Sequence, residues 1–144
     1  MSQAFENEIE KYNDDENSTF TVDPDEDGDA YHYDITYTPP EGSDYEQGIY
    51  RIKCEVPKDY PATRPKLTFA NPIYHPNIGN DGGICKGLFD QCNNLKDMMK
   101  VIDDILLEPD FDDVLRHDCK DTFLKDEKLF HQIARQEANK LSGQ

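Results

Sequence analysis

The chain has 144 residues, with 31 Asp and Glu against 15 Lys and Arg, which gives a formal net charge of −16. Such acidity argues against nucleic acid and anionic membranes as partners, because both are bound mainly through Lys and Arg. Hydrophobic residues make up 35% of the chain, too many for a wholly disordered acidic protein, so we expect a single domain over 1–144.

The negative charge is concentrated at the beginning of the chain. Residues 1–46 hold fifteen acidic side chains and one basic one, Lys11, for a net −14, which leaves −2 for residues 47–144. We call residues 1–46 the acidic third. Its surface is either simply solvated or suited to a basic partner.

The first half of the chain predicts one helix and then a sheet. Phe5, Ile9 and Tyr12 fall on one face of a helix over 2–13, with Ser2 as a plausible N-cap. Apolar and polar residues then alternate, which predicts a meander of about four antiparallel strands. These strands lie near 20–22, 31–37, 49–56 and 67–70.

The second half predicts a long irregular loop followed by helices. Pro and Gly punctuate residues 71–90, and a long loop of this kind inside a compact domain is usually functional. Helical periodicity returns in three segments, expected over 95–107, 114–119 and 125–141. The last helix has a predicted buried stripe of Leu129, Phe130, Ile133, Ala134 and Ala138. The order of elements is typical of an α+β domain.

One acidic turn imitates a calcium-binding loop. Asp23, Asp25 and Asp27 precede Gly28, and Asp34 stands at the twelfth position. The flanking segments alternate like strands and the last ligand is Asp rather than Glu. An acidic turn between two strands is therefore the favoured interpretation, with calcium binding as the alternative.

The four cysteines, Cys54, Cys85, Cys92 and Cys119, are expected to be reduced thiols. The chain begins without a recognisable signal peptide, which favours the cytoplasm or nucleus, where disulfides are rare. Their spacing contains no CxxC pair, so we expect no metal site.

One group of residues in the loop is of the types that covalent catalysis needs. His75, Pro76 and Asn77 stand eight to ten residues before Cys85, which Gly82, Gly83 and Gly87 surround. A cysteine can hold an acyl group as a thioester, and a nearby amide can support a developing oxyanion. The alternative for Cys85 is a buried core thiol, and the alternative for Asn77 is an amide that only stabilises a turn.

Here the sequence resembles the ubiquitin-conjugating enzymes, and the resemblance covers nearly the whole chain. It is carried by the Asn77-to-Cys85 spacing and by motifs before and after it, namely Tyr60-Pro61, Pro65, Phe69, Tyr74-His75-Pro76-Asn77, Gly82, Ile84-Cys85, Leu88, Leu106 to Pro109 and Asp112-Asp113. It implies the family's fold: an N-terminal helix, a four-stranded antiparallel meander, a long active-site loop and C-terminal helices.

The resemblance also implies roles. Cys85 would accept ubiquitin or a ubiquitin-like protein as a thioester from an activating enzyme, and a substrate lysine or a ligase would then receive it. Asn77 would stabilise the oxyanion or brace the loop that does so, and Asp113 would orient the incoming lysine. His75 and Pro76 would shape the loop. ATP would be used upstream by the activating enzyme, so no cofactor is expected in this chain, which we expect to be a monomer.

The sequence also departs from the family's pattern. Ala62 stands where a bulky apolar residue commonly docks on ligases, and Lys86 stands where Leu commonly follows the nucleophile. The first helix carries acids where a basic face usually meets the activating enzyme. Two alternatives therefore stay open: a catalytically silent module that binds ubiquitin or a ligase, and an acidic binding protein for a basic partner.

Overall fold

The computed structural model describes residues 3–25 and 31–142. Its four strands form one antiparallel sheet in the order β1-β2-β3-β4. They are β1 (Phe20–Pro24), β2 (His32–Tyr37), β3 (Tyr50–Glu55) and β4 (Lys66–Phe69). The helix α1 (Gln3–Asp14) precedes the sheet, and η1 (Lys86–Phe89), α2 (Leu95–Leu107), α3 (His117–Lys125) and α4 (Glu127–Asn139) follow it. The expected α+β order is confirmed.

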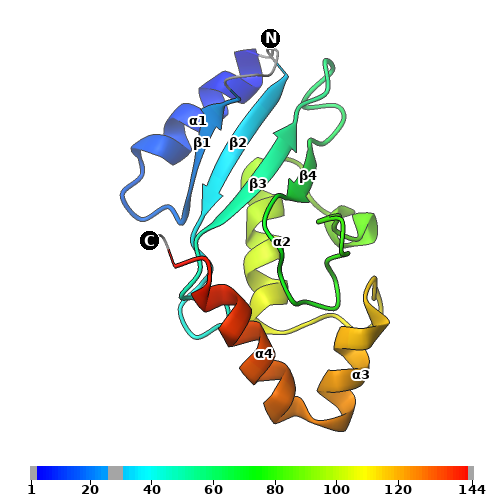
Figure 1. Ribbon diagram of the computed structural model, residues 1–144. Helices are drawn as coiled ribbons and strands as arrows, with labels where there is room; N and C mark the ends of the chain where they lie inside the picture. Colours follow the sequence, from blue (N-terminus) through cyan, green and yellow to red (C-terminus); the bar gives the residue numbers. More distant parts are fainter. Residues whose placement is uncertain (1–2, 26–30, 143–144) are drawn as a thin grey trace.

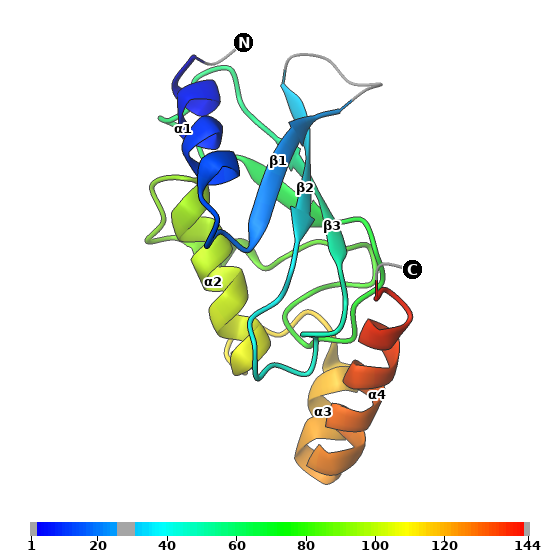
Figure 2. The same cartoon turned by 90° about the vertical axis from the view of Figure 1, so that its left-hand side faces the viewer.

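The helix α2 packs against one face of the sheet (Figure 1). Figure 2 shows α1 and α2 on the same side of the strands, while α3 and α4 lie side by side at the opposite end of the molecule from α1. Met98 and Ile102 of α2 are buried in the same core as Ile35 and Ile52 of the sheet, as the alternation in the strands predicts. None of the described helices is long and apolar enough to cross a membrane.

Two predictions about the C-terminal helices are wrong in detail. The short helix expected over 114–119 begins only at His117, because the N–H groups of Leu115 and Arg116 donate to the carbonyl of Pro76 at 2.8 and 3.0 Å. The helix expected to begin at Lys125 begins at Glu127. Asp126 separates it from α3 by accepting a hydrogen bond from Leu129 N at 3.1 Å, as an N-cap does.

The predicted stripe of the last helix is also wider than the observed one. Phe130, Ala134 and Ala138 are buried, at a spacing of four residues. Leu129 is 41% exposed and Ile133 is half-buried, because each lies a rotation of about 100° before the stripe.

In the N-terminal part, α1 begins at Gln3, with Phe5 and Ile9 buried and Tyr12 half-buried. Ser2, the expected N-cap, lies outside the described residues, as do Asp27 and Gly28 of the acidic turn. The flanks of that turn are strands, as its favoured interpretation predicts.

Candidate active site

The segment that leads to Cys85 runs tightly along the end of β4. Phe69 N donates to the carbonyl of Gly82 at 2.9 Å, and Gly82 has a φ of +85°. A Cβ on Gly82 would lie 2.0 Å from the carbonyl oxygen of Phe69, so only glycine permits this approach. The buried Ile84 forms a bridge with Ile78, which fixes the backbone directly before Cys85.

Cys85 differs from the other three cysteines in exposure. It is half-buried at the start of η1, whereas Cys54, Cys92 and Cys119 are buried. Burial raises the pKa of Cys54 to about 12 and that of Cys119 to about 11, and it also raises the pKa of Cys92. Because the thiolate is the nucleophile, these three thiols are poorly suited to covalent catalysis.

His75 is fully buried and neutral. Its Nε2–H donates to the carbonyl of Ile105 at 2.6 Å, and its Nδ1 accepts from Asn77 N at 3.0 Å. Burial lowers the pKa of His75 to about 4. Both ring nitrogens are engaged by the backbone, which suits the loop-shaping role that the resemblance implies.

The side chain of Asn77 joins the segment before Cys85 to the segment after α2. Its Nδ2 donates to the carbonyls of Asp110 and Asp113 at 2.6 and 2.9 Å, and its Oδ1 accepts from Asp110 N at 2.9 Å. These bonds use both N–H groups of the buried amide. In this geometry Asn77 braces residues 110–113 and has no further donor for an oxyanion.

Asp113 lies beside the helix that Cys85 begins. Its Oδ1 is 3.6 Å from the point that a Cβ on Gly87 would occupy, two residues beyond Cys85. A methyl group at this position would be in ordinary van der Waals contact with the carboxylate. The three predicted site residues therefore come from two adjoining segments, 75–87 and 110–113.

Arg116 and Phe111 support the site, and the sequence analysis missed both. The Arg116 guanidinium donates to the carbonyl of Ile73 at 3.3 Å and pairs with Asp118 at 2.8 Å. Phe111 packs on Phe123 of α3, with ring centroids 5.0 Å apart. No local sequence pattern links Arg116 or Phe111 to the site residues, so the sequence alone did not identify them.

Metal-binding potential is absent from the part of the chain that the structure describes. No group of three or more His, Cys, Asp or Glu side chains in 3–25 and 31–142 could hold a metal ion.

Comparison with known proteins defines the class. The ubiquitin-conjugating enzyme family model matches residues 4–138. The chain is 35% identical over 101 residues to "Ubiquitin conjugating enzyme E2 B" of Dictyostelium discoideum, covering 67% of this chain and 68% of that protein. It is 36% identical over 110 residues to "Probable ubiquitin-conjugating enzyme E2 31" of Arabidopsis thaliana, covering 74% and 71%. It is 33% identical over 125 residues to "Ubiquitin-conjugating enzyme E2 13" of Saccharomyces cerevisiae, covering 84% and 81%.

The chain belongs to the ubiquitin-conjugating enzyme family. Its activity is ubiquitin conjugation, a transferase reaction in which the family passes its modifier through a thioester. Ubiquitin, an activating enzyme and a ligase are the classes of partner that this membership implies.

Proposed function

We propose that Cys85 is the nucleophile that carries the modifier. One observation carries this proposal: Cys85 is the most accessible of the four thiols and follows the tight segment that Asn77 ties to Asp113. The three buried thiols have raised pKa values and lack such a setting.

The proposed transfer has two steps. The Cys85 thiolate attacks the thioester that joins the modifier's C-terminal glycine to the activating enzyme, and the activating enzyme's thiol leaves. A substrate lysine, after losing a proton to water, then forms a C–N bond to the same carbonyl carbon. The C–S bond breaks, and Cys85 leaves as a thiolate that takes up the second proton of the amine.

Asn77 and Asp113 support the second step. Asn77 holds residues 110–113 in place, and we expect the Asp113 carboxylate, which lies beside Gly87, to attract and orient an incoming lysine ammonium. We expect Asp113→Ala to slow the attack of free lysine on the charged enzyme about tenfold or more, while the amount of thioester stays unchanged. Single-turnover discharge assays separate the two quantities.

We also propose a cellular setting for this enzyme. A ubiquitin-activating enzyme or the activating enzyme of a ubiquitin-like protein supplies the modifier, using ATP, and this chain needs no cofactor of its own. It acts as a monomer in the cytoplasm or nucleus, without nucleic acid or membrane partners, and passes the modifier to a ligase or a protein substrate.

A charging assay tests the proposal for Cys85. With activating enzyme, ATP and a panel of modifiers, the enzyme should form an adduct that a reducing thiol releases. Cys85→Ala should abolish the adduct, and Cys92→Ala, which removes a buried thiol, should retain it. Binding of ubiquitin without charging by any modifier would instead indicate a catalytically silent module.

A further inference from the structure

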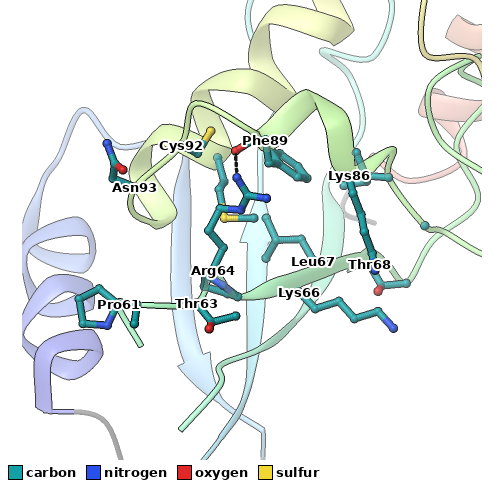
Figure 3. A pocket seen from close by; sticks show the side chains of 15 residues that line it. Pro61, Thr63, Arg64, Lys66, Leu67, Thr68, Lys86, Phe89, Cys92 and Asn93 are labelled. Carbon is teal, nitrogen blue, oxygen red and sulfur yellow. Dashed lines mark hydrogen bonds between the residues drawn. The ribbon is translucent and has the colours of Figure 1, made fainter. Parts of the chain in front are cut away.

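Two side chains join distant segments of the chain, and they differ in how they respond to pH. The Arg64 guanidinium donates to the carbonyl of Phe89 across a pocket of about 610 Å³ (Figure 3). Because a guanidinium stays charged throughout the accessible pH range, this contact is permanent. The other contact is made by His131 of α4, and the charge of a histidine changes near neutral pH.

His131 lies between two carboxylates from different parts of the fold. Its Nδ1 is 2.5 Å from Oδ2 of Asp44, in the loop 38–49 that joins β2 to β3, and its Nε2 is 3.2 Å from Oε2 of Glu127, in the first turn of α4. A carboxylate only accepts hydrogen bonds, so both ring nitrogens must carry a hydrogen for both contacts to be favourable. The protonated imidazolium alone meets this condition, whereas a neutral ring turns a lone pair toward one carboxylate.

Asp44 is the centre of this cluster and is well shielded from water. Its side chain is 11% exposed, and its second oxygen accepts from Arg135 Nε of α4 at 3.0 Å. Among the described residues, Lys128 lines the same groove on α4, and α3 presents the uncharged ring of Phe123, 5.9 Å from the ring of His131. One permanent cation and one titratable cation therefore join the loop 38–49 to α4.

We call Asp44, Glu127, His131 and Arg135 the α4 clamp. The hydrogen bond to Asp44, with a smaller contribution from Glu127, raises the pKa of His131 above its ordinary value of 6.5. A pKa that is raised in the folded chain gives stability that is complete below pH 6.5 and is lost as pH rises through the folded value. The clamp is therefore tighter at the acidic end of the neutral range.

The loop 38–49 carries a contact from the clamp to the active-site segment. Tyr45, which follows Asp44, is 1% exposed, and its hydroxyl donates to the carbonyl of Tyr74 at 2.6 Å. The ring of Tyr45 also packs on the ring of His75, with centroids 5.7 Å apart. A shift of Asp44 relative to α4 would therefore be transmitted to the residues directly before Pro76.

The helix side of the clamp contacts the same segment. Phe130, which precedes His131, is buried, and its ring lies 5.4 Å from the ring of Tyr74. The sequence neighbours of the two clamp residues on either side thus meet at residues 74–75. These residues lead into Asn77, whose side chain braces residues 110–113.

We propose that His131, when protonated between Asp44 and Glu127, clamps α4 to the loop 38–49 and so positions the active-site segment for transfer to lysine. His131 and Asp44 are positioning residues, because they act through residues 74–75 rather than on the reacting atoms. The proposal rests on Cys85 as the nucleophile. It adds a proton-dependent control of transfer that is separate from the ionisation of the lysine itself.

The pH profile of discharge tests the proposal. His131→Asn keeps a neutral donor toward Asp44 at every pH. Wild type and variant are charged, the thioester is quantified, and the rate of discharge onto free lysine is measured from about pH 6.5 to about pH 9. The ionisation of lysine affects both enzymes equally and cancels in the ratio of rates. We expect wild type to be about threefold faster at the lower pH and the ratio to fall towards one at the higher pH, as for a partly exposed ion pair.

Two variants make the test specific. Glu127→Gln changes a side chain that is 63% exposed, so it keeps the fold, and it should move the fall in the ratio to lower pH. His32→Asn is the matched control, because His32 on β2 faces Glu55 at 3.2 Å on the sheet, away from α4. A ratio for His131→Asn that does not change with pH, or an equal change for His32→Asn, would overturn the proposal.

Amide exchange of the uncharged enzyme separates this proposal from the proposed function. Gly48 N donates to the carbonyl of Tyr45 at 2.9 Å within the loop. After correction for its intrinsic pH dependence, exchange at Gly48 should be about threefold faster at high pH than at low pH, and Asp44→Asn should abolish this difference. If no thioester forms on Cys85, the proposed function fails, and exchange still tests the clamp: protection that does not change with pH overturns it.

Discussion

The active-site segments and the helix α1 are both rich in polar side chains, but they use them differently. His75 and Asn77 are fully buried, and every polar atom of their side chains bonds to the backbone. Glu10 of α1 is exposed to solvent and Glu6 is half-buried. The difference shows that a polar residue determines local structure when it is buried with partners, whereas an exposed acid mainly sets the electrostatic potential of its surface.

Glu8 of α1 is only half-buried, but it resembles the buried residues because its carboxylate is fully engaged by partners. Its carboxylate accepts hydrogen bonds from the hydroxyls of Tyr12 and Tyr60 and, at 3.0 Å, from Leu95 N at the start of α2. An anion is favoured at that helix end by the free N–H groups. Glu8 therefore attaches α1 to α2.

The largest expected effect comes from Asn77→Ala. This substitution leaves the N–H and carbonyl of the half-buried Asp110 and the carbonyl of the half-buried Asp113 without their partner, so we expect the free energy of unfolding to fall by about 3 kcal/mol. Urea denaturation measures it, with the exposed Asn93→Ala as control. A loss below about 1 kcal/mol would show that the amide does not brace the loop.

A similar effect is expected from protonation of His75. Its pKa is about 4 in the folded chain and 6.5 when free, so below pH 6.5 the unfolded state binds more protons. Stability should therefore fall by roughly 3 kcal/mol from this residue as pH falls from 6.5 to 4.

Nuclear magnetic resonance of the histidine rings checks this directly. His75 should remain neutral at pH 5, which lies between its folded and free pKa values. His131 provides the contrast, because its hydrogen bond to Asp44, at 2.5 Å, raises its pKa. A His75 ring that titrates near 6.5 would mean that it is not buried as described.

A smaller effect separates the two kinds of acid within α1. Glu8→Ala removes the acceptor of three hydrogen bonds, and we expect it to cost about 2 kcal/mol of unfolding free energy. Glu10→Ala, at an exposed position, should change stability by less than about 0.5 kcal/mol. Equal effects in thermal or urea unfolding would remove the distinction between Glu8 and its neighbours.

The smallest effect concerns charging. Reversing Glu6 and Glu10 to Lys should change the rate of charging by an activating enzyme a few-fold, in a salt-dependent manner, because exposed charges act mainly on association. Glu8 is left out because its substitution would also change stability. Unchanged rates at low and high salt would mean that these acids are only a solvated surface.

Local patterns predicted much of this molecule. Alternation of apolar residues placed the four strands, and the spacing from Asn77 to Cys85 identified the loop that the structure folds against β4. The break at Asp126 was missed because helical periodicity continues on both sides of it. The bonds from Asn77 to Asp110 and Asp113 were missed because these residues lie 33 and 36 positions further along the chain and meet Asn77 only through the fold.

The central claim is that Cys85 carries the modifier, and one measurement tests it most directly. In Cys85→Ser the hydroxyl should form an oxygen ester, which resists the reducing thiol that releases the wild-type adduct. Peptide mass spectrometry of the charged variant should then find the modifier's C-terminal glycine on residue 85. A modifier attached to Cys54, Cys92 or Cys119 of the wild-type chain, or no adduct with any modifier, would contradict the account.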